Sequence, residues 1–303
     1  MRLAWNEDQA TFDTVLDQML ADAAFAPVAD WGRFDHGAAL ETQLADNGFF
    51  DAAAEPDLGP VAAAWMVHRA AQAPVCFECA ASALIRPFLG RAMPRPLAVV
   101  VDDAPGAIRY LPQARGLVAI TERVRYADLP AGAVRPVESL YAYPMGVADP
   151  AALDWQVLDA DPVRLRILWQ VAVAAELTGV LRAGMDAVLA HVRDRRQFGQ
   201  PLGAFQAVQH RLATASVDIE GATLQMLKAA QSLHPQDAAA ALGHAPGVAT
   251  RITYDLHQFM GAMGLTLEHP LHRWTYRAKL LRAEMGGAGA AGLAYAAQRW
   301  GVA

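Results

Sequence analysis

The sequence predicts a mainly helical protein with a short β segment in its middle. Apolar residues recur at three- and four-residue spacings in residues 1–93 and again in 161–303, as in helices that bury one face. Between them, residues 94–160 contain eight prolines and short β-type runs. We therefore expect an N-terminal helical domain (1–93), a truncated β domain (94–160) and a C-terminal four-helix bundle (161–303).

Helices are expected throughout the N-terminal segment. Phe12, Leu16 and Met19 lie on one apolar stripe of the first helix. Asn47-Gly48 ends the second helix, and prolines open the last two. The predicted helices cover residues 8–24, 38–44, 60–73 and 75–89.

The middle segment is expected to form a small antiparallel unit with exposed edges. Pro105-Gly106 marks a turn between its first two strands. The predicted strands cover residues 97–101, 107–111, 117–121 and 155–158.

The C-terminal segment has the strongest helix start signal in the chain. Asp161 is a favourable N-cap and Pro162 occupies the first helical position. Long helices joined by short loops favour antiparallel packing, which predicts the four-helix bundle. Pro246-Gly247 is expected to break or kink the third helix. The predicted helices cover residues 161–195, 202–233, 237–260, 270–284 and 293–300.

The overall composition excludes several classes of protein. The chain has 303 residues, 54% hydrophobic and 18% charged, which rules out a disordered chain. Its 25 basic and 31 acidic residues give a net charge of −6, so we expect no nucleic-acid partner. No apolar run reaches about 18 residues, so we expect no membrane partner either. Two cysteines provide no disulfide framework, which favours a reducing, cytoplasmic location.

Two short motifs have weak functional interpretations. Cys76 and Cys79 form a C-x-x-C pair, but a zinc site needs four ligands and no second pair exists. We interpret them as buried thiols in a helical core. Gly287 to Gly292 matches G-x-G-x-x-G, yet a helix precedes it and no acidic residue follows at the required distance. A flexible or tightly packed helix junction is the better interpretation.

A group of histidines near the C-terminus also resembles a metal site. Their spacing differs from the i, i+4 pair of a helical zinc site, so we expect no metal. The group contains His257, His269, His272 and Glu268.

Two longer stretches offer more specific chemistry. Residues 193–210 join a helix end, a glycine turn and a helix start that are rich in Arg, Gln and Phe. They provide a guanidinium for a phosphate, amides for a polar ring edge and an aromatic face for stacking. Residues 256–272 contain small residues that let the backbone approach a ligand closely. On pattern alone, an ordinary helix–loop junction explains each stretch equally well.

At these two stretches the sequence resembles the acyl-CoA dehydrogenase family. The R-x-Q-F-G-x-P-(5)-Q region and the Q-x-x-G-x-x-G-x-x-x-E-H-P-L-H region match in order and spacing. The resemblance covers residues 161–284 and extends more weakly to residues 44–49. It implies stacked helical, β and bundle domains, FAD between the last two, and a second subunit that completes the FAD site.

The resemblance also assigns residues to the cofactor. Arg195 would reach the FAD pyrophosphate of the neighbouring subunit, and the aromatic and amide groups after it would line the adenosine side. The bend after residue 258 would touch the same cofactor from the partner chain. The implied FAD-binding residues are Arg195, Gln197, Phe198, Gln206, Gln258, Gly261 and Ala262.

The sequence departs from the family in two places. The β domain is about half the usual length, and the loop that holds the flavin ring is not found between residues 89 and 117. The glutamate base that removes the α-proton of the acyl thioester is also missing: its two family positions are Met285 and Trp169. The neighbouring Glu284 is the candidate catalytic base if its helix ends early and the loop re-aims it.

Three hypotheses follow from the resemblance. The first is an FAD-dependent acyl-CoA dehydrogenase that oxidises an acyl-CoA thioester between its α and β carbons. The second is a non-catalytic subunit that completes the FAD site of a longer family member, as in bacterial heteromeric enzymes of sterol side-chain breakdown. The third is a flavin-free scaffold. The first two require a homodimer or a heteromer.

Overall fold

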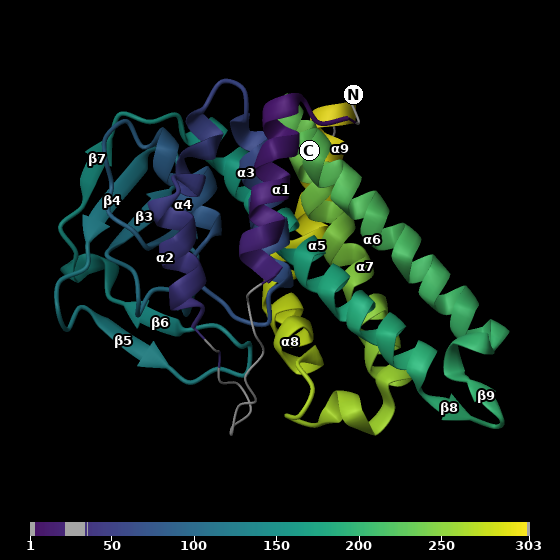
Figure 1. The fold of residues 1–303 in the computed structure, drawn as a ribbon. Helices are drawn as coiled ribbons and strands as arrows, with labels where there is room; N and C mark the ends of the chain where they lie inside the picture. The colour runs from purple at the N-terminus through teal and green to yellow at the C-terminus, as the bar shows by residue number, and fades with distance from the viewer. Residues whose placement is uncertain (1–3, 22–33, 35, 302–303) are drawn as a thin grey trace.

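The computed structural model describes residues 4–21, 34 and 36–301. Figure 1 shows the strands of the middle segment on one side of the molecule and the long helices on the other, with α1 (Glu7–Ala21) between them. The predicted mainly helical fold, with a small β region and a C-terminal bundle, is confirmed. Within the described residues, no helix is both long and apolar enough to cross a membrane.

The N-terminal helices follow the prediction in part. Residues 22–24 of the first predicted helix lie outside the described residues. The predicted helix over 75–89 is wrong for residues 75–79, and two short helices cover residues 80–84 and 86–88. Its start is delayed because the Glu78 carboxylate accepts the backbone N–H groups of Ala81 (2.6 Å) and Ser82 (3.2 Å), which caps a helix beginning at residue 80. The elements are α1 (Glu7–Ala21), α2 (Ala38–Asp46), η1 (Phe49–Ala54), α3 (Gly59–Gln72), α4 (Ala80–Leu84) and η2 (Arg86–Phe88).

The middle segment forms two small sheets. A four-stranded sheet has the order β1-β3-β4-β7, and a three-stranded sheet has the order β2-β6-β5. The strands are β1 (Leu97–Val101), β2 (Ile108–Arg109), β3 (Gly116–Ile120), β4 (Val124–Asp128), β5 (Val134–Val137), β6 (Met145–Ala148) and β7 (Gln156–Leu158). The domain boundaries at residues 93 and 160 stay predictions.

The prediction of a purely antiparallel β unit is wrong. β1 and β3 pair in parallel, with Leu97 opposite Gly116. This pairing is possible because β2, between them in sequence, leaves for the second sheet and pairs with β6. The sequence analysis does not predict β4, β5 and β6. β5 contains Pro136, which a strand at the edge of a sheet tolerates.

The C-terminal helices pack as the expected bundle, with different bounds. The elements are α5 (Pro162–Asp194), α6 (Gln206–Ser232), α7 (Pro235–Met260), α8 (Leu271–Leu281) and α9 (Gly287–Trp300), with the short helices η5 (Gly261–Leu265) and η6 (Glu284–Gly286). Pro246 does not interrupt α7, because a buried helix keeps its other hydrogen bonds and packing. α8 ends at residue 281, earlier than predicted, and α9 begins earlier than predicted.

Asp161 holds the start of α5, the longest helix named above. Its carboxylate accepts the N–H groups of Val163 (2.9 Å) and Arg164 (3.3 Å), which confirms the predicted N-cap. We expect Asp161→Ala to lower the free energy of unfolding by about 1 kcal/mol, measured by urea denaturation. Asp161→Asn should recover most of the loss, since an amide oxygen also caps. Equal losses for both variants would contradict this assignment.

Candidate functional site

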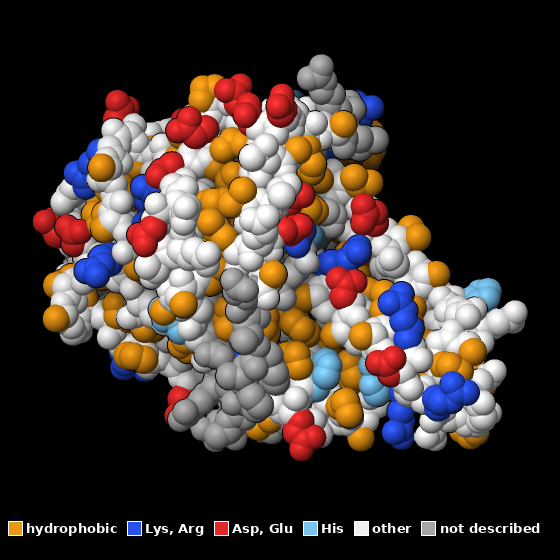
Figure 2. Space-filling view, viewed as in Figure 1, with side chains coloured by type: hydrophobic (Ala, Val, Ile, Leu, Met, Phe, Trp, Pro, Cys, Tyr) orange, Lys and Arg blue, Asp and Glu red, His pale blue; other side chains and the backbone are white. Residues whose placement is uncertain are grey.

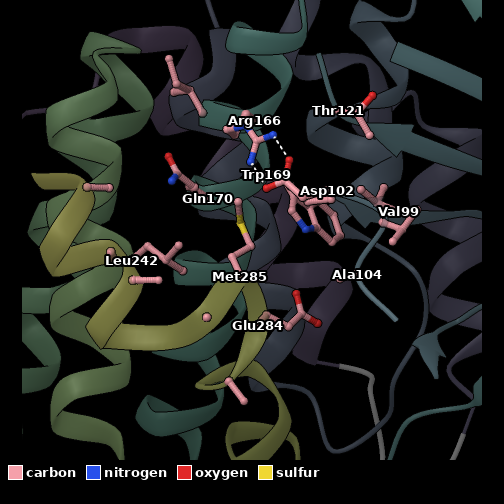
Figure 3. A pocket seen from close by; sticks show the side chains of 18 of the residues that line it. Val99, Asp102, Ala104, Thr121, Arg166, Trp169, Gln170, Leu242, Glu284 and Met285 are labelled. Atoms are coloured by element: carbon pink, nitrogen blue, oxygen red, sulfur yellow. Dashed lines mark hydrogen bonds and ion pairs between the residues drawn. The ribbon is translucent and has the colours of Figure 1, made fainter. Parts of the chain in front are cut away.

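A cavity of about 930 Å³ lies between the β segment and the helical bundle. Its walls come from β1, from the turn that follows it, from the first turns of α5, and from the α8–α9 link with α9. Figure 3 shows Trp169, Met285 and Glu284 around this space, with the Asp102–Arg166 ion pair also at its wall. Its volume is typical of a site for a small molecule or cofactor.

The backbone after α8 aims Glu284 toward this cavity. Because α8 ends at Leu281, Glu284 belongs to a separate short turn. Met285 and Gly286 follow with positive φ angles of 54° and 79°, which turn the chain sharply into α9. The structure therefore brings Glu284 together with Met285 and Trp169, the two positions to which the resemblance assigns the base.

Arg109 binds the candidate base directly. Its Nε donates to Glu284 Oε1 at 2.5 Å, and its Nη1 donates to Glu176 Oε2 at 2.7 Å. The other oxygen of Glu176 accepts the Tyr143 hydroxyl at 2.7 Å. The guanidinium also lies 5.0 Å from the Trp169 ring. Sequence reasoning missed Arg109 as a site residue, since its partners lie 67 and 175 positions away.

The electrostatics of this cluster follow from its burial. Arg109 is 5% exposed and Glu176 is 6% exposed. Burial alone would lower the pKa of Arg109, but Glu176 and Glu284 together raise it, so the guanidinium stays charged. Burial raises the pKa of Glu284, and Arg109 opposes that rise. Glu284 is thus a carboxylate whose proton affinity depends on one arginine.

The charges of the cavity do not suit a pyrophosphate. Its acidic lining residues are Asp102, Glu122 and Glu284. Its two arginines already bind carboxylates: Arg109 binds Glu284, and Arg166 binds Asp102 at 2.5 Å. A flavin ring or an acyl chain suits the apolar walls, but phosphate groups would need cations from elsewhere.

The predicted FAD-binding residues of the first stretch lie on a projecting hairpin and at the start of α6. Strands β8 (Arg196–Gln197) and β9 (Gln200–Pro201) form the hairpin, with Phe198 and Gly199 in the left-handed region at its tip. Phe198 is 89% exposed and meets Phe205 edge-on. Arg195, Gln197 and Gln206 are also exposed. Figure 2 shows basic side chains at this end of the molecule.

The predicted residues of the second stretch lie at the same end of the bundle. Gln258 is in the last turn of α7, and Gly261 and Ala262 begin η5; all three are exposed. Figure 1 shows α7 ending at the same end of the bundle as β8 and β9. Burial, followed by the nearby charge of His191 in the last turn of α5, lowers the pKa of His269 after the bend.

These residues are distant from the cavity within one chain. Of the described residues that line the cavity, none belongs to the predicted FAD-binding set. The cavity touches α5 up to Gln170, whereas Arg195 follows its last residue. At 1.5 Å per residue, the helix between them is about 37 Å long. Within one chain, the two groups are therefore too far apart to contact the same part of one ligand.

The weaker motifs have structural explanations. Cys76 and Cys79 are free and buried, although in the loop before α4 and at its cap rather than in a helix. Burial raises the pKa of Cys76 to about 12, so it stays a thiol. The glycine pattern lies within α9, where Gly243 of α7 packs close to Ala291. It is therefore a packed helix rather than a nucleotide-binding turn.

The histidines have separate hydrogen-bond partners. His257 Nε2 pairs with Thr275 Oγ1 at 2.9 Å, and His272 Nδ1 donates to the His269 carbonyl at 2.9 Å. His269 Nδ1 accepts the Leu271 N–H at 3.1 Å. Across the described residues, no group of three His, Cys, Asp or Glu side chains is placed to hold a metal ion.

Comparison with known proteins finds the same resemblance in the C-terminal part of the chain. Residues 170–297 match the model described as acyl-CoA dehydrogenase, C-terminal domain. The predicted resemblance to the acyl-CoA dehydrogenase family is therefore confirmed for this domain, which is less than half of the chain. The probable acyl-CoA dehydrogenase YngJ of Bacillus subtilis is 35% identical over 117 residues, 37% of this chain and 31% of that protein. FadE34 of Mycobacterium tuberculosis is 34% identical over 140 residues, 44% of this chain and 20% of that protein. The alignments thus span about a third or less of these relatives.

Solved structures extend the similarity to the rest of the acyl-CoA dehydrogenase fold. A chain of the ChsE4-ChsE5 complex from Mycobacterium tuberculosis has a TM-score of 0.77 at 19% identity, with 97% of both chains covered. Butyryl-CoA dehydrogenase from Megasphaera elsdenii has a TM-score of 0.77 at 18% identity, covering 98% of this chain and 99% of that one. At these identities the likeness concerns the fold alone.

Proposed function

We propose that this chain is a subunit of a heteromeric acyl-CoA dehydrogenase, and that it completes the FAD site of a longer family member without supplying the catalytic base. The observation that supports this most is the distance of about 37 Å along α5 between Arg195 and the cavity. Residues so far from their own cavity can contact a cofactor held in such a cavity only if that cavity belongs to a second chain. The free thiols Cys76 and Cys79 agree with a cytoplasmic location.

The exposed end of the bundle suits the phosphate and adenosine part of FAD. Among the described residues, Arg195 takes part in no ion pair, so its guanidinium is available to a pyrophosphate. Phe198 offers an exposed ring for stacking, and Gln197, Gln206 and Gln258 offer amides. The backbone at Gly261 and Ala262 is exposed to the same side. Bound FAD would accept the β-hydride of an acyl-CoA whose α-proton a base on the longer subunit removes.

A second candidate function is favoured by Glu284. It faces the cavity beside both family base positions, so a homodimer of this chain could perform α,β-dehydrogenation of an acyl-CoA itself. The ion pair with Arg109 argues against that role, since both Glu284 oxygens face the guanidinium, at 2.5 and 3.5 Å. We therefore place the heteromer first.

Flavin binding by the assembly tests the proposal. The chain would be co-purified with a longer acyl-CoA dehydrogenase of the same organism, and FAD would be titrated by absorbance. We expect Arg195→Ala to raise the dissociation constant of FAD about 10- to 150-fold, the value of one charge-assisted hydrogen bond. Arg299→Ala, at an exposed arginine in the last turn of α9, is the matched control and should leave binding unchanged.

Two results would overturn this assignment. A colourless protein that takes up no FAD, alone or with the longer subunit, would leave the flavin-free scaffold as the explanation. Oxidation of an acyl-CoA by the chain alone, with an artificial electron acceptor and abolished by Glu284→Gln, would instead establish the second candidate.

A further inference from the structure

The contact between Arg109 and Glu284 carries an inference about the chain's own cavity. Arg109 comes from β2, Glu176 from α5 and Glu284 from the turn before α9, so the cluster joins three elements at one wall. Both oxygens of Glu176 are occupied, one by Arg109 and one by Tyr143. Glu176 is therefore a fixed counterion, and Glu284 is the carboxylate of the cluster that faces the cavity.

We propose that Arg109 is a positioning residue that sets the proton affinity of Glu284 and holds its carboxylate against the cavity wall. The Nε of Arg109 donates to Glu284 Oε1 at 2.5 Å, and the Nη2 of Arg109 donates to Glu284 Oε2 at 3.5 Å. A carboxylate held by a guanidinium in this way is a weaker base than the same buried carboxylate without the guanidinium, because taking up a proton would sacrifice the ion pair. This inference deepens the proposed function by naming the residue that keeps the cavity of this chain non-catalytic.

The geometry around Arg109 indicates that the arginine is fixed in this position. Its guanidinium is buried beside the rings of Trp169 (5.0 Å) and Tyr143 (5.7 Å), which restricts it to the plane between the two carboxylates. Trp169 stands at one family position of the base and Met285 at the other. The cation thus lies beside the place where a substrate α-carbon would have to approach Glu284.

The charge of the cluster explains why Arg109 has this influence. One cation faces two carboxylates, so the group carries a net negative charge in a buried place. Without Arg109, Glu176 and Glu284 would face each other, and like charges in a shared site raise the pKa of one carboxyl strongly. Glu176 already acts on Glu284 in that direction.

A set of substitutions separates this role from simple packing. Arg109→Met should raise the pKa of Glu284 by about 1–3 units, measured by carbon-13 NMR of labelled glutamate with Glu284→Gln for assignment. Arg109→Lys keeps the charge but not the planar fork, and should leave the pKa near that of the wild type. If Arg109→Met does not fold, the double variant Arg109→Met, Glu176→Gln keeps the net charge of the cluster. It should still raise the pKa of Glu284, because the burial then acts unopposed.

Carbodiimide labelling provides a second readout. Protonated carboxyl groups react, so labelling of Glu284 near pH 6.5, quantified by mass spectrometry, should increase several-fold in Arg109→Met and in the double variant. Glu122 lines the same cavity, is exposed and serves as the internal control. An unchanged pKa and unchanged labelling of Glu284 in a folded variant would overturn the proposal. Neither measurement involves FAD or a partner, so this inference and the heteromer proposal fail separately.

Discussion

Replacing Gly179 with Val should lower the free energy of unfolding by about 3 kcal/mol or more. Gly179 lies where α5 crosses α3. A Cβ atom there would be 2.2 Å from the carbonyl oxygen of His68 and 2.8 Å from the Ala71 Cβ. The nearest obstacle is backbone, which cannot rotate away as a side chain can, so the two helices must separate. The loss is large compared with the total stability of a typical domain, about 5–15 kcal/mol.

The crossing at Gly179 also bears on the site. Glu176 lies one turn earlier on α5. Across the same contact, the Thr178 Oγ1 and the His68 Nδ1 form a hydrogen bond of 3.0 Å. We expect the unfolding midpoint of Gly179→Val in urea to fall clearly below that of the wild type. Gly292→Val is the matched control, because no atom lies within 4 Å of a Cβ at that helical position. Equal stability of the two variants would show that α3 and α5 are not packed as described.

The features that the sequence predicted well have local causes. Asp161-Pro162 starts α5 through hydrogen bonds to residues two and three positions away. Apolar spacing located α1, α3 and the long bundle helices. The motif at 193–210 indicated a glycine turn between two helices, which lies in the β8–β9 hairpin, and the motif at 256–272 indicated the bend. Their role toward FAD is still a proposal.

The features that the sequence did not predict depend on distant partners. The carbonyls at the end of α3 accept hydrogen bonds from Trp274 and Arg277 of α8, about 200 positions later, which helps to explain why residues 73–79 do not continue as helix. The parallel pair of β1 and β3 depends on β2 leaving for another sheet. Arg109 becomes a site residue only because β2 packs near α5 and the α8–α9 link.

The early end of α8 connects the features that the sequence predicted with those that it did not predict. The predicted helix over 270–284 would have placed Glu284 on its surface, one residue and about 100° away from the family base position. Ending α8 at Leu281 frees three residues to turn, and Met285 takes a left-handed conformation that few side chains adopt. This turn aims Glu284 at the cavity and into contact with Arg109.

Replacing Glu176 with Leu should have the second large effect, a loss of about 3–5 kcal/mol in the free energy of unfolding at pH 7. The substitution leaves the buried Tyr143 hydroxyl without its acceptor and removes one of the two carboxylates that compensate Arg109. Leu fills a similar volume, so the loss reports the polar contacts rather than a cavity. The measurement is the urea midpoint of the folded assembly.

Glu176→Gln is the control for this effect, since an amide oxygen can still accept one of these hydrogen bonds. This variant should lose clearly less free energy of unfolding than Glu176→Leu.

The pH dependence of the free energy of unfolding gives a further check. In the wild type, folding raises the pKa of Glu284. Glu284 therefore contributes its full stabilisation of the folded state below its unfolded pKa of about 4.3. This contribution is lost as the pH rises through the folded pKa of Glu284. Removing the charge of Glu176 lowers the folded pKa of Glu284, so both Glu176 variants should lose less stability than the wild type across that pH range. A wild-type pH profile in both variants would mean that the charge of Glu176 does not act on Glu284, and Glu176 would then serve only as a hydrogen-bond partner of Arg109 and Tyr143.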